Sequence, residues 1–479
     1  MRTPYNPPVA ASFHFERSIP FSPENSAEAL RAIPALPGVF ALHGPRVEGQ
    51  PEAEPYLTRA ADLRRRITRI LAPPDSQSKR LNLRTRVARI DYTITGSEFE
   101  STLALYHASA AIFGLAEARR RLRLHTPFFL RFTAGNALPR VYSTTRLSRR
   151  ALAHTYGPFP SRAAADRYCD AVLDLFKLRR CTEDLAPYPE HPGCVYQEMN
   201  KCLAPCNQAC TPEGAAAYAA EAVAVEAFFS THGESLLTQL TADREQASAD
   251  LDFERAAQLH TQFLRVKSAA ALADPLVQPI PNLRAVIIQK SAQPASLLSS
   301  RSAPLLSSRT LSERSESKGK GPASPEPCTG PEPAASIFLL ASGCLVGPER
   351  LEPAPALTPA TAINPADSPT PSPEDRAAEL LGDLATSARP HPKSVPDLTT
   401  LSDHLSLLRR WYYRPEKQRV GEVFFPKAEG SFRREEAADK PSWPIRRILN
   451  AATRISLGDP KLAAEALRQP PQTPVEPVH

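Results

Sequence analysis

Five of the eight cysteines of this 479-residue chain lie within thirty residues, and thiols at this density can bind a metal or form disulfides. Their spacing is Cys181-x12-Cys194-x7-Cys202-x3-Cys206, with Cys210 after three more residues. Structural zinc sites usually contain two close thiol pairs, and only Cys202 and Cys206 form one here. Iron–sulfur sites tolerate uneven spacing and a proline beside a ligand, such as Pro205. The spacing therefore favours an iron–sulfur cluster, and it leaves zinc and buried free thiols open.

Disulfides are the weaker explanation of these thiols. The N-terminal stretch MRTPYNPPVAASFHFERSIPF has no apolar run long enough for a signal peptide, and no segment approaches the length of a membrane span. We therefore expect a cytoplasmic protein without a membrane partner. Thiols stay reduced in that compartment.

The whole chain carries a formal net charge of +7 from 58 basic and 51 acidic residues. Its arginines are clustered in the first half. The runs are Arg64-Arg65-Arg66, Arg119-Arg120-Arg121, Arg149-Arg150 and Arg179-Arg180. A guanidinium group can grip two phosphate oxygens, so the runs suit nucleic acid. A solvated arginine-rich surface explains them equally well.

The elements that must position these residues give an α+β protein. Strands are expected at 37–44, 55–57 and 86–96, a hairpin within 126–147, and a strand pair at 282–290 and 337–348. Helices are expected at 60–71, at 97–115 behind a serine cap, within 156–180 after a Gly-Pro turn, and over 212–272 with a break near THGES. Proline reaches 51 residues and is concentrated late in the chain, where Ser/Pro-rich segments favour disorder.

The predicted organisation follows from these elements. It comprises an irregular leader (1–33), a first α/β domain (34–125), a hairpin, helix and cysteine region (126–211), a helical region (212–275), a strand pair (281–350) with a disordered insertion (291–335), a low-complexity linker (351–400) and a short C-terminal tail (401–479).

The string FKLRRCTEDL…HPGCVYQEMNKCLAPC resembles the cysteine region of the excinuclease UvrC family, the incision component of bacterial nucleotide excision repair. The YGPFPS turn is similar to that family as well. The resemblance implies a 4Fe–4S cluster, with zinc as the alternative, on four ligands: Cys181, Cys194, Cys202 and Cys206.

A second resemblance covers 240–266, where ASADLDFERAAQL is similar to the UVR motif, a helical hairpin found in both UvrB and UvrC. Its pattern puts Asp252 at a helix start with Phe253 exposed beside it. The resemblance implies docking on the excinuclease UvrB helicase through Leu251, Phe253, Glu254 and Ala257. A hairpin packed into the core, or an adaptor protein unrelated to DNA cleavage, is the alternative.

The segment PGVFALHG…PYLTRAADLRRRI resembles a GIY-YIG nuclease domain, which cuts a phosphodiester with a tyrosine, an arginine and a metal-bound glutamate. The resemblance gives Tyr56 and Arg66 as residual catalytic residues, and Arg59, Arg64 and Arg65 as DNA-binding residues.

Two catalytic positions of that family are changed. Phe40 stands for the first tyrosine, and Leu105 stands for the metal glutamate; Glu98 and Glu100 are the nearest carboxylates. We therefore expect a preserved fold with a degenerate active site. Mg²⁺ or Mn²⁺ is implied only if the nuclease is active.

The family's second nuclease half is expected to be largely missing, so the chain reads as truncated. HLSLLRRWYYRPEKQRVGEVFF resembles a small piece at its start. The sequence thus predicts a UvrC-like repair protein that binds DNA, UvrB or both without cutting. The rival prediction is an active single-incision GIY-YIG endonuclease.

Overall fold

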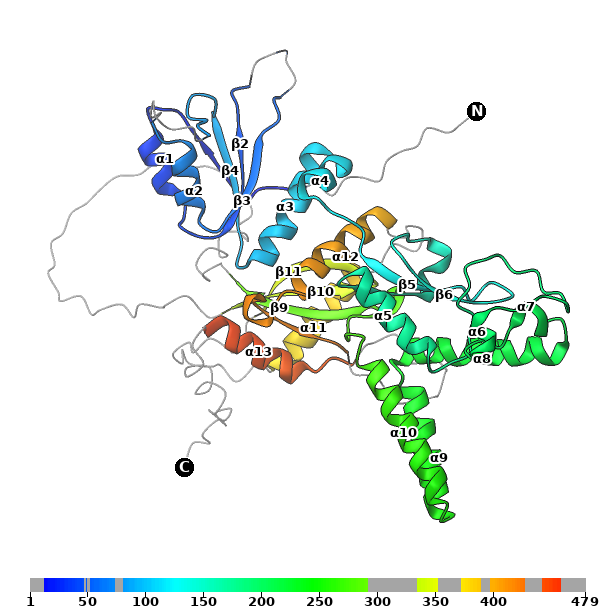
Figure 1. Cartoon of the computed structure of the whole chain (residues 1–479). Coiled ribbons are helices and arrows are strands. Elements are labelled where there is room, and N and C mark those ends of the chain that lie inside the picture. The colour runs from blue at the N-terminus through cyan, green and yellow to red at the C-terminus, as the bar shows by residue number, and fades with distance from the viewer. Residues whose placement is uncertain are drawn as a thin grey trace, which may run out of the picture.

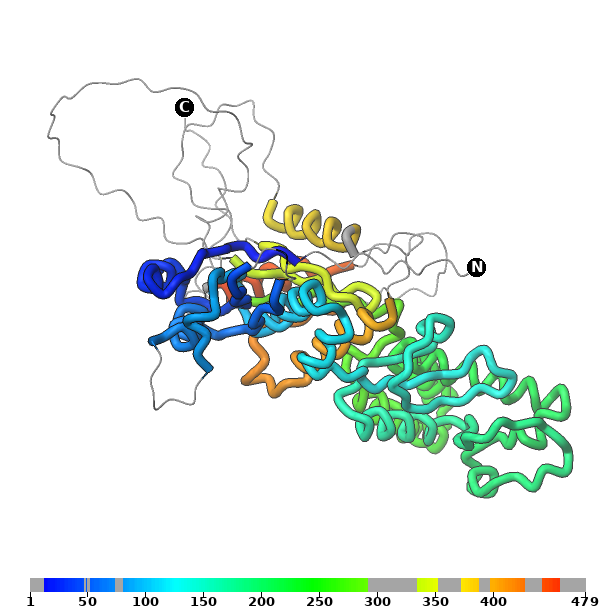
Figure 2. The backbone as a smooth tube through the Cα atoms, turned by 90° about the horizontal axis from the view of Figure 1, so that it is seen from above, coloured from blue at the N-terminus to red at the C-terminus, as the bar shows by residue number. Residues whose placement is uncertain are grey.

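The computed structural model describes residues 13–46, 49, 52–73, 81–291, 334–351, 372–388, 397–426 and 442–457. Within these residues the chain forms three four-stranded antiparallel sheets, which we call the amino-terminal, middle and carboxy-terminal sheets (Figure 1). Figure 2 shows the amino-terminal part and the middle part extending to opposite sides of the carboxy-terminal sheet.

The amino-terminal sheet has the order β1-β4-β2-β3. Its elements are β1 (Arg17–Pro20), α1 (Ser26–Ala32), β2 (Gly38–His43), β3 (Tyr56–Ala60), α2 (Leu63–Ile70) and β4 (Arg89–Ile94). The strands predicted at 37–44 and 55–57 are confirmed and pair with each other, with Leu42 opposite Tyr56. The predicted irregular leader is wrong in its second half, because β1 pairs with β4 and α1 packs beside α2.

The close approach of β2 to its neighbours explains Gly38. A Cβ at this position would collide with the Thr93 carbonyl oxygen and would lie 2.7 Å from the Leu63 side chain. Leu63 and Ile67 are fully buried on α2, as their helical spacing predicts. Asp62 caps this helix by accepting a hydrogen bond from the Arg65 backbone N–H.

Helix α3 (Glu98–Phe113) links the amino-terminal sheet to the carboxy-terminal sheet, and α4 (Leu115–Leu122) follows it. Ser97 caps α3 by accepting a hydrogen bond from the Glu100 N–H, as the sequence predicts. The helix buries Phe99, Leu103 and Tyr106 in one apolar cluster with side chains of the carboxy-terminal sheet.

The middle sheet has the order β6-β5-β7-β8. Its elements are β5 (Phe128–Phe132), β6 (Val141–Thr144), the 3-10 helix η1 (Arg149–His154), β7 (Thr155–Phe159), α5 (Arg162–Leu173) and β8 (Gln278–Pro279). The predicted β5–β6 hairpin is confirmed. The Gly-Pro pair expected to form a turn instead lies inside β7, at Gly157 and Pro158.

Five helices follow α5: α6 (Val195–Glu198), α7 (Pro205–Gln208), α8 (Pro212–Thr231), α9 (Glu234–Ala249) and α10 (Phe253–Ala270). The predicted break near THGES is confirmed, because His232 and Gly233 both have left-handed backbones. A second break at 250–252 makes α9 and α10 an antiparallel hairpin, which projects from the rest of the molecule (Figure 1).

The carboxy-terminal sheet has the order β11-β10-β9-β12. Its elements are η2 (Ile280–Asn282), β9 (Arg284–Lys290), β10 (Ala335–Ala341), β11 (Cys344–Leu351), α11 (Pro373–Ala388), α12 (Leu398–Tyr412), η4 (Glu416–Gln418), β12 (Glu422–Phe424) and α13 (Ile445–Leu457). Helices α11 and α13 cover one face and α12 the other.

The predicted pairing of β9 with β10 is confirmed. The proposed disordered insertion at 291–335 lies almost entirely outside the described residues. The predicted linker and short tail are wrong as structural descriptions, because α11, α12, β12 and α13 complete the carboxy-terminal sheet and its cover. In the part of the chain that the structure describes, no helix is both long and apolar enough to cross a membrane.

Candidate functional site

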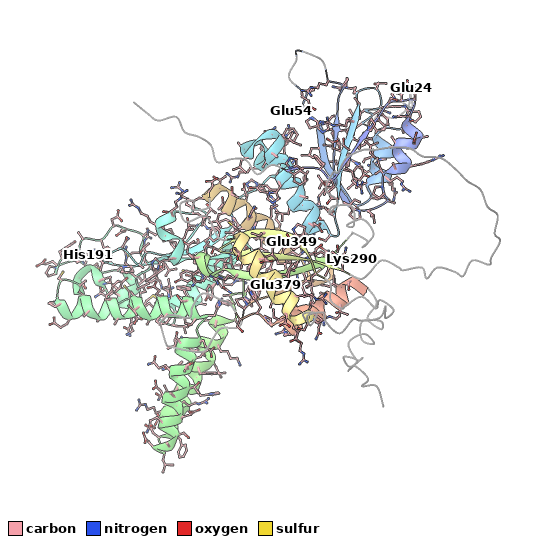
Figure 3. All side chains as sticks on the ribbon, turned by 180° about the vertical axis from the view of Figure 1, so that it is seen from behind. Glu24, Glu54, His191, Lys290, Glu349 and Glu379 are labelled. Atoms are coloured by element: carbon pink, nitrogen blue, oxygen red, sulfur yellow. The ribbon has the colours of Figure 1, made fainter. Side chains whose placement is uncertain are left out.

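The four predicted ligand cysteines come from short elements between α5 and α8. Cys181 follows α5, Cys194 caps α6, Cys202 lies in the next loop and Cys206 lies in α7. The loop is anchored to the end of α5 by a hydrogen bond from the Leu203 N–H to the Lys177 carbonyl, 3.0 Å long. Figure 3 places this region, marked by His191, at the far end of the molecule.

Burial and nearby charge shift the pKa values of two of these thiols. Burial raises the pKa of Cys202 to about 11, the Ala204 N–H opposes the rise, and charge on Cys194, Cys181 and Cys206 would add to it. Burial also raises the pKa of Cys206. Cys210 is exposed.

The donor set fits a soft metal centre in type and number. The sulfur of Cys202 accepts a hydrogen bond from the Ala204 N–H at 3.3 Å, and that of Cys181 accepts one from Arg179 at 3.7 Å. N–H donors directed at thiolate sulfur are a normal part of iron–sulfur sites. However, the described residues contain no group of three or more His, Cys, Asp or Glu side chains arranged to hold a metal ion.

The tip of the α9–α10 hairpin is an exposed apolar surface. Leu251 is 72% exposed and Phe253 67% exposed, and Glu254 and Ala257 are exposed on the same helix as Phe253. Asp252 caps α10 by accepting a hydrogen bond from the Arg255 N–H, so the predicted helix start is confirmed. All four predicted docking residues are therefore accessible to a partner.

The base of the hairpin is held by the core of the middle part of the chain. Leu240 from α9 and Val266 and Ala269 from α10 are buried in the same cluster as α5 and α8. A rigid base and an exposed tip distinguish this hairpin from one packed wholly into a core.

The predicted catalytic residues lie on the edge strand β3 and on α2. The Tyr56 ring is partly buried, with its centroid 6.3 Å from that of Phe40, and Phe40 is fully buried. Arg66 is half-buried, with no side-chain ion pair among the described residues. Leu105 offers no ligand atom, and the neighbouring Tyr106 donates its hydroxyl to Asp403 at 3.2 Å.

The nearest carboxylate to this face, Glu98, is already held by two cations. Its oxygens accept from Arg414 at 2.7 Å and from Arg59 at 2.9 Å. These contacts, led by Arg414, lower the pKa of Glu98 to about 2. Arg59, which the sequence assigns to DNA, is thus paired with a carboxylate.

The other two predicted DNA-binding arginines differ from each other. Arg64 donates to the carbonyl oxygens of Ile33 at 2.6 Å and Arg31 at 3.3 Å, so it closes the end of α1. Arg65 is exposed, and its side chain has no partner among the described residues. The structure does not bring Arg59, Arg64 and Arg65 together as one phosphate-binding group.

A polar cavity of about 460 Å³ lies where α3 meets the carboxy-terminal sheet, and sequence reasoning missed it. It is lined by residues that are far apart in the chain, among them Glu16, Glu100, His107, Ser336 and Glu349. Burial raises the pKa of Glu100 to about 7. Only the tertiary structure brings these side chains together.

The comparisons with known proteins cover the middle of the chain. The family described as UvrC/Cho excinuclease, middle domain, matches residues 128–227, and the UvrB/uvrC motif matches residues 234–269. The first match spans β5, β6, β7, α5 and the cysteine region, and the second spans the α9–α10 hairpin. No solved structure matches the chain.

Curated relatives carry the name UvrABC system protein C. The protein from Salmonella heidelberg is 28% identical over 242 residues, which are 50% of this chain and 37% of the relative. That from Idiomarina loihiensis is 27% identical over 252 residues, which are 51% and 38% of the two chains. The match thus spans less than two fifths of each relative. Together, the two family matches and these relatives identify the middle of the chain as a UvrC-type middle domain followed by a UVR motif.

Proposed function

We propose that this chain binds DNA and docks on the UvrB helicase of the excision repair system through the tip of the α9–α10 hairpin. The observation that carries the docking proposal is the exposure of Leu251 and Phe253 beside a capped helix start. Two exposed apolar side chains two positions apart form a small apolar patch, and contiguous apolar patches mark protein contacts more often than single exposed side chains do. Glu254 and Ala257 lie beside Phe253 on α10 and complete a small interface.

The test is a pull-down of purified UvrB with the intact chain. Phe253→Ala should weaken capture at least about tenfold, because a central aromatic anchor commonly contributes more than 1 kcal/mol. Val223→Ala is the matched control, since Val223 is 66% exposed on α8, away from the tip. Equal capture by wild type and Phe253→Ala would refute the docking surface.

We propose that the amino-terminal sheet retains a GIY-YIG-like fold without metal-dependent cleavage. Its β2–β3 hairpin, α2 and α3 support the fold. The apolar Phe40 and Leu105, and the engagement of Glu98 by Arg59 and Arg414, support the loss of activity. Nicking of damaged duplex in Mg²⁺ or Mn²⁺ that Tyr56→Phe abolishes would favour the active endonuclease instead.

We propose that Cys181, Cys194, Cys202 and Cys206 hold a 4Fe–4S cluster. The origin of the four thiols in the short segments between α5 and α8, and the N–H donors at two of their sulfurs, support this assignment. Bound there, a cluster would join the loops around α6 and α7 covalently. Protein purified without oxygen should be brown and contain iron, and a colourless protein containing zinc would contradict the assignment.

A further inference from the structure

An acid-free stretch of the chain runs through the middle sheet. Residues 118–165 contain ten arginines and no Asp or Glu. The chain has 51 acidic residues among 479, so a stretch of this length without any is unusual. Positive charge is therefore concentrated on the few elements that these residues form. These elements are the end of α4, strands β5, β6 and β7, and η1.

Of the five arginines near the two ends of this stretch, four have a carboxylate partner, and the exception is the exposed Arg123. Arg119 pairs with Asp403 at 2.9 Å, Arg120 and Arg121 pair with Glu117 at 2.6 Å, and Arg162 pairs with Asp166 at 3.4 Å. The carboxylates of these ion pairs already balance most of the charge of the four arginines, which therefore stabilise the fold or the helices.

The arginines in between are different. No carboxylate among the described residues pairs with any of five: Arg131, Arg140, Arg146, Arg149 and Arg150. Arg146, Arg149 and Arg150 are exposed, and Arg131 and Arg140 are half-buried. We call these five residues the β5–β6 arginine patch.

The sheet register puts part of the patch on one face. Arg131 lies opposite Tyr142 in the β5–β6 ladder, and Arg140 shares the Tyr142 face because strand side chains alternate. The Arg140 guanidinium lies 4.9 Å from the centroid of the Tyr142 ring. A ring at this distance holds the guanidinium in place, so less freedom is lost when it binds a ligand.

The other face of the strands is closed. Leu130, Phe132 and Val141 are buried with Ala165, Tyr168 and Val172 of α5. Helix η1 is anchored by the buried Ala151 and by Leu152, which packs on the neighbouring core, so Arg149 and Arg150 at its start face solvent. The patch therefore sits on a rigid support.

We propose that the β5–β6 arginine patch contacts the phosphate backbone of duplex DNA. Five guanidinium groups without a carboxylate partner, one of them beside an aromatic ring, suit the repeating phosphate charges of nucleic acid. The inference rests on the DNA-binding part of the proposed function and names the surface responsible. In Figure 1 β5 and β6 lie above α8 and the α9–α10 hairpin projects below it, so DNA and a protein docked at the hairpin tip have separate sites.

The test measures binding of a short fluorescent duplex by anisotropy, from about 50 to 200 mM salt. The test variant is Arg131→Gln/Arg146→Gln/Arg149→Gln/Arg150→Gln. The control variant, Arg162→Gln/Arg167→Gln/Arg255→Gln/Arg265→Gln, loses the same charge from exposed sites on α5 and α10. Circular dichroism and thermal melting establish that both variants fold.

We expect the test variant to bind the duplex at least about tenfold more weakly at 0.1 M salt, and its plot of log K against log salt to be shallower by about three to four. The control should retain nearly the wild-type slope. Equal effects of the two variants would show that only the net charge of the protein affects binding, and would overturn the inference.

Two further outcomes are decisive. Wild type that binds duplex, together with a test variant that binds it equally well, would overturn the inference and leave the proposed function standing. Wild type that fails to bind duplex at low salt would overturn both. Loss of binding to a polyglutamate peptide or to anionic vesicles, with duplex binding unchanged, would assign the patch to a different partner and refute our assignment.

Discussion

Glu98 differs most clearly from a metal-binding carboxylate of a nuclease, because two arginines already pair with it. The two guanidinium groups that hold it come from β3 and from the residues after α12, 316 positions apart from Glu98 in the case of Arg414. Sequence reasoning could identify Glu98 as a nearby carboxylate but could not find Arg414, because local patterns carry no information about so distant a partner. The carboxylate thus joins two parts of the fold.

Glu98→Ala should destabilise the protein by about 1 kcal/mol at pH 7. The lowered pKa of Glu98 alone would give a larger destabilisation. However, Glu98 is half-exposed, so solvent screens its ion pairs. Because the folded pKa lies below the ordinary value, this stabilisation is present above about pH 4.5 and is lost as the pH falls toward 2. Urea unfolding of both proteins at several pH values checks the prediction, and a difference that persists at pH 2 would contradict it.

Glu100 should have the opposite pH dependence. Its raised pKa means that the fold favours the neutral carboxyl, so its contribution lowers the unfolding free energy as the pH rises from about 4.5 to 7. Glu100→Gln should remove this loss, which is at most about 3 kcal/mol at 1.36 kcal/mol for each unit of pKa shift. Urea unfolding of Glu100→Gln at pH 5 and pH 8 measures it.

The control for Glu100 is Glu213→Gln, which changes an exposed glutamate in the first turn of α8. That variant should follow the wild-type pH profile. If Glu100→Gln also follows it, the carboxyl of Glu100 is not the group that titrates between these pH values.

At the scale of the element, the α9–α10 hairpin was the most predictable part of the molecule. Its turn and its cap are local features, so the sequence was sufficient to place Asp252 at the helix start and Phe253 in solvent. The strand pairings of β2 with β3 and of β9 with β10 were predictable for the same reason, from apolar alternation. Helices α11 and α13 were missed because their apolar residues are flanked by Pro-rich segments.

Leu251 in this hairpin has a left-handed backbone, with φ of +62°. This conformation is strained for a residue with a side chain and is unstrained for glycine. Leu251→Gly should therefore leave the unfolding free energy unchanged or raise it by up to about 1 kcal/mol. The same change should weaken binding to UvrB, because it removes an exposed apolar side chain. Thermal melting and a pull-down test the two effects separately.

Leu264→Ala provides the comparison for Leu251→Gly, since Leu264 is 51% exposed on α10 and lies more than two turns from the tip. It should leave binding to UvrB nearly unchanged. A destabilised Leu251→Gly protein would show that Leu251 packs against something at the tip.

At the scale of the whole molecule, a buried polar cluster joins the helices α3, α4 and α12. Asp403 has only 1% of its side chain exposed. One of its oxygens accepts a hydrogen bond from Tyr106, and the other forms an ion pair with Arg119 at 2.9 Å. Tyr106 and Asp403 are 297 positions apart, so no local pattern could pair them. The candidate DNA surface was likewise found only in the structure, because which arginines are already paired depends on tertiary contacts.

Asp403→Ala should destabilise the protein by about 3 kcal/mol, because it leaves the buried Tyr106 hydroxyl without its acceptor and the half-buried Arg119 without its ion-pair partner. Asp403→Asn should cost less, because its side-chain oxygen still accepts one bond. The fluorescence of Trp411, which lies on α12 with its ring centroid 4.8 Å from that of Phe99, reports unfolding at this junction. Equal stability of Asp403→Ala and wild type would contradict a role in holding the helices together.

The register of β9 and β10 has a practical consequence. Lys290 and Ala335 are direct cross-strand partners, so the polypeptide leaves the carboxy-terminal sheet and re-enters it at adjacent points. A tight Asn-Gly turn therefore has the right span to replace everything between them. The same junction offers a place to graft a reporter domain whose own ends lie close together, leaving the DNA surface and the hairpin tip free.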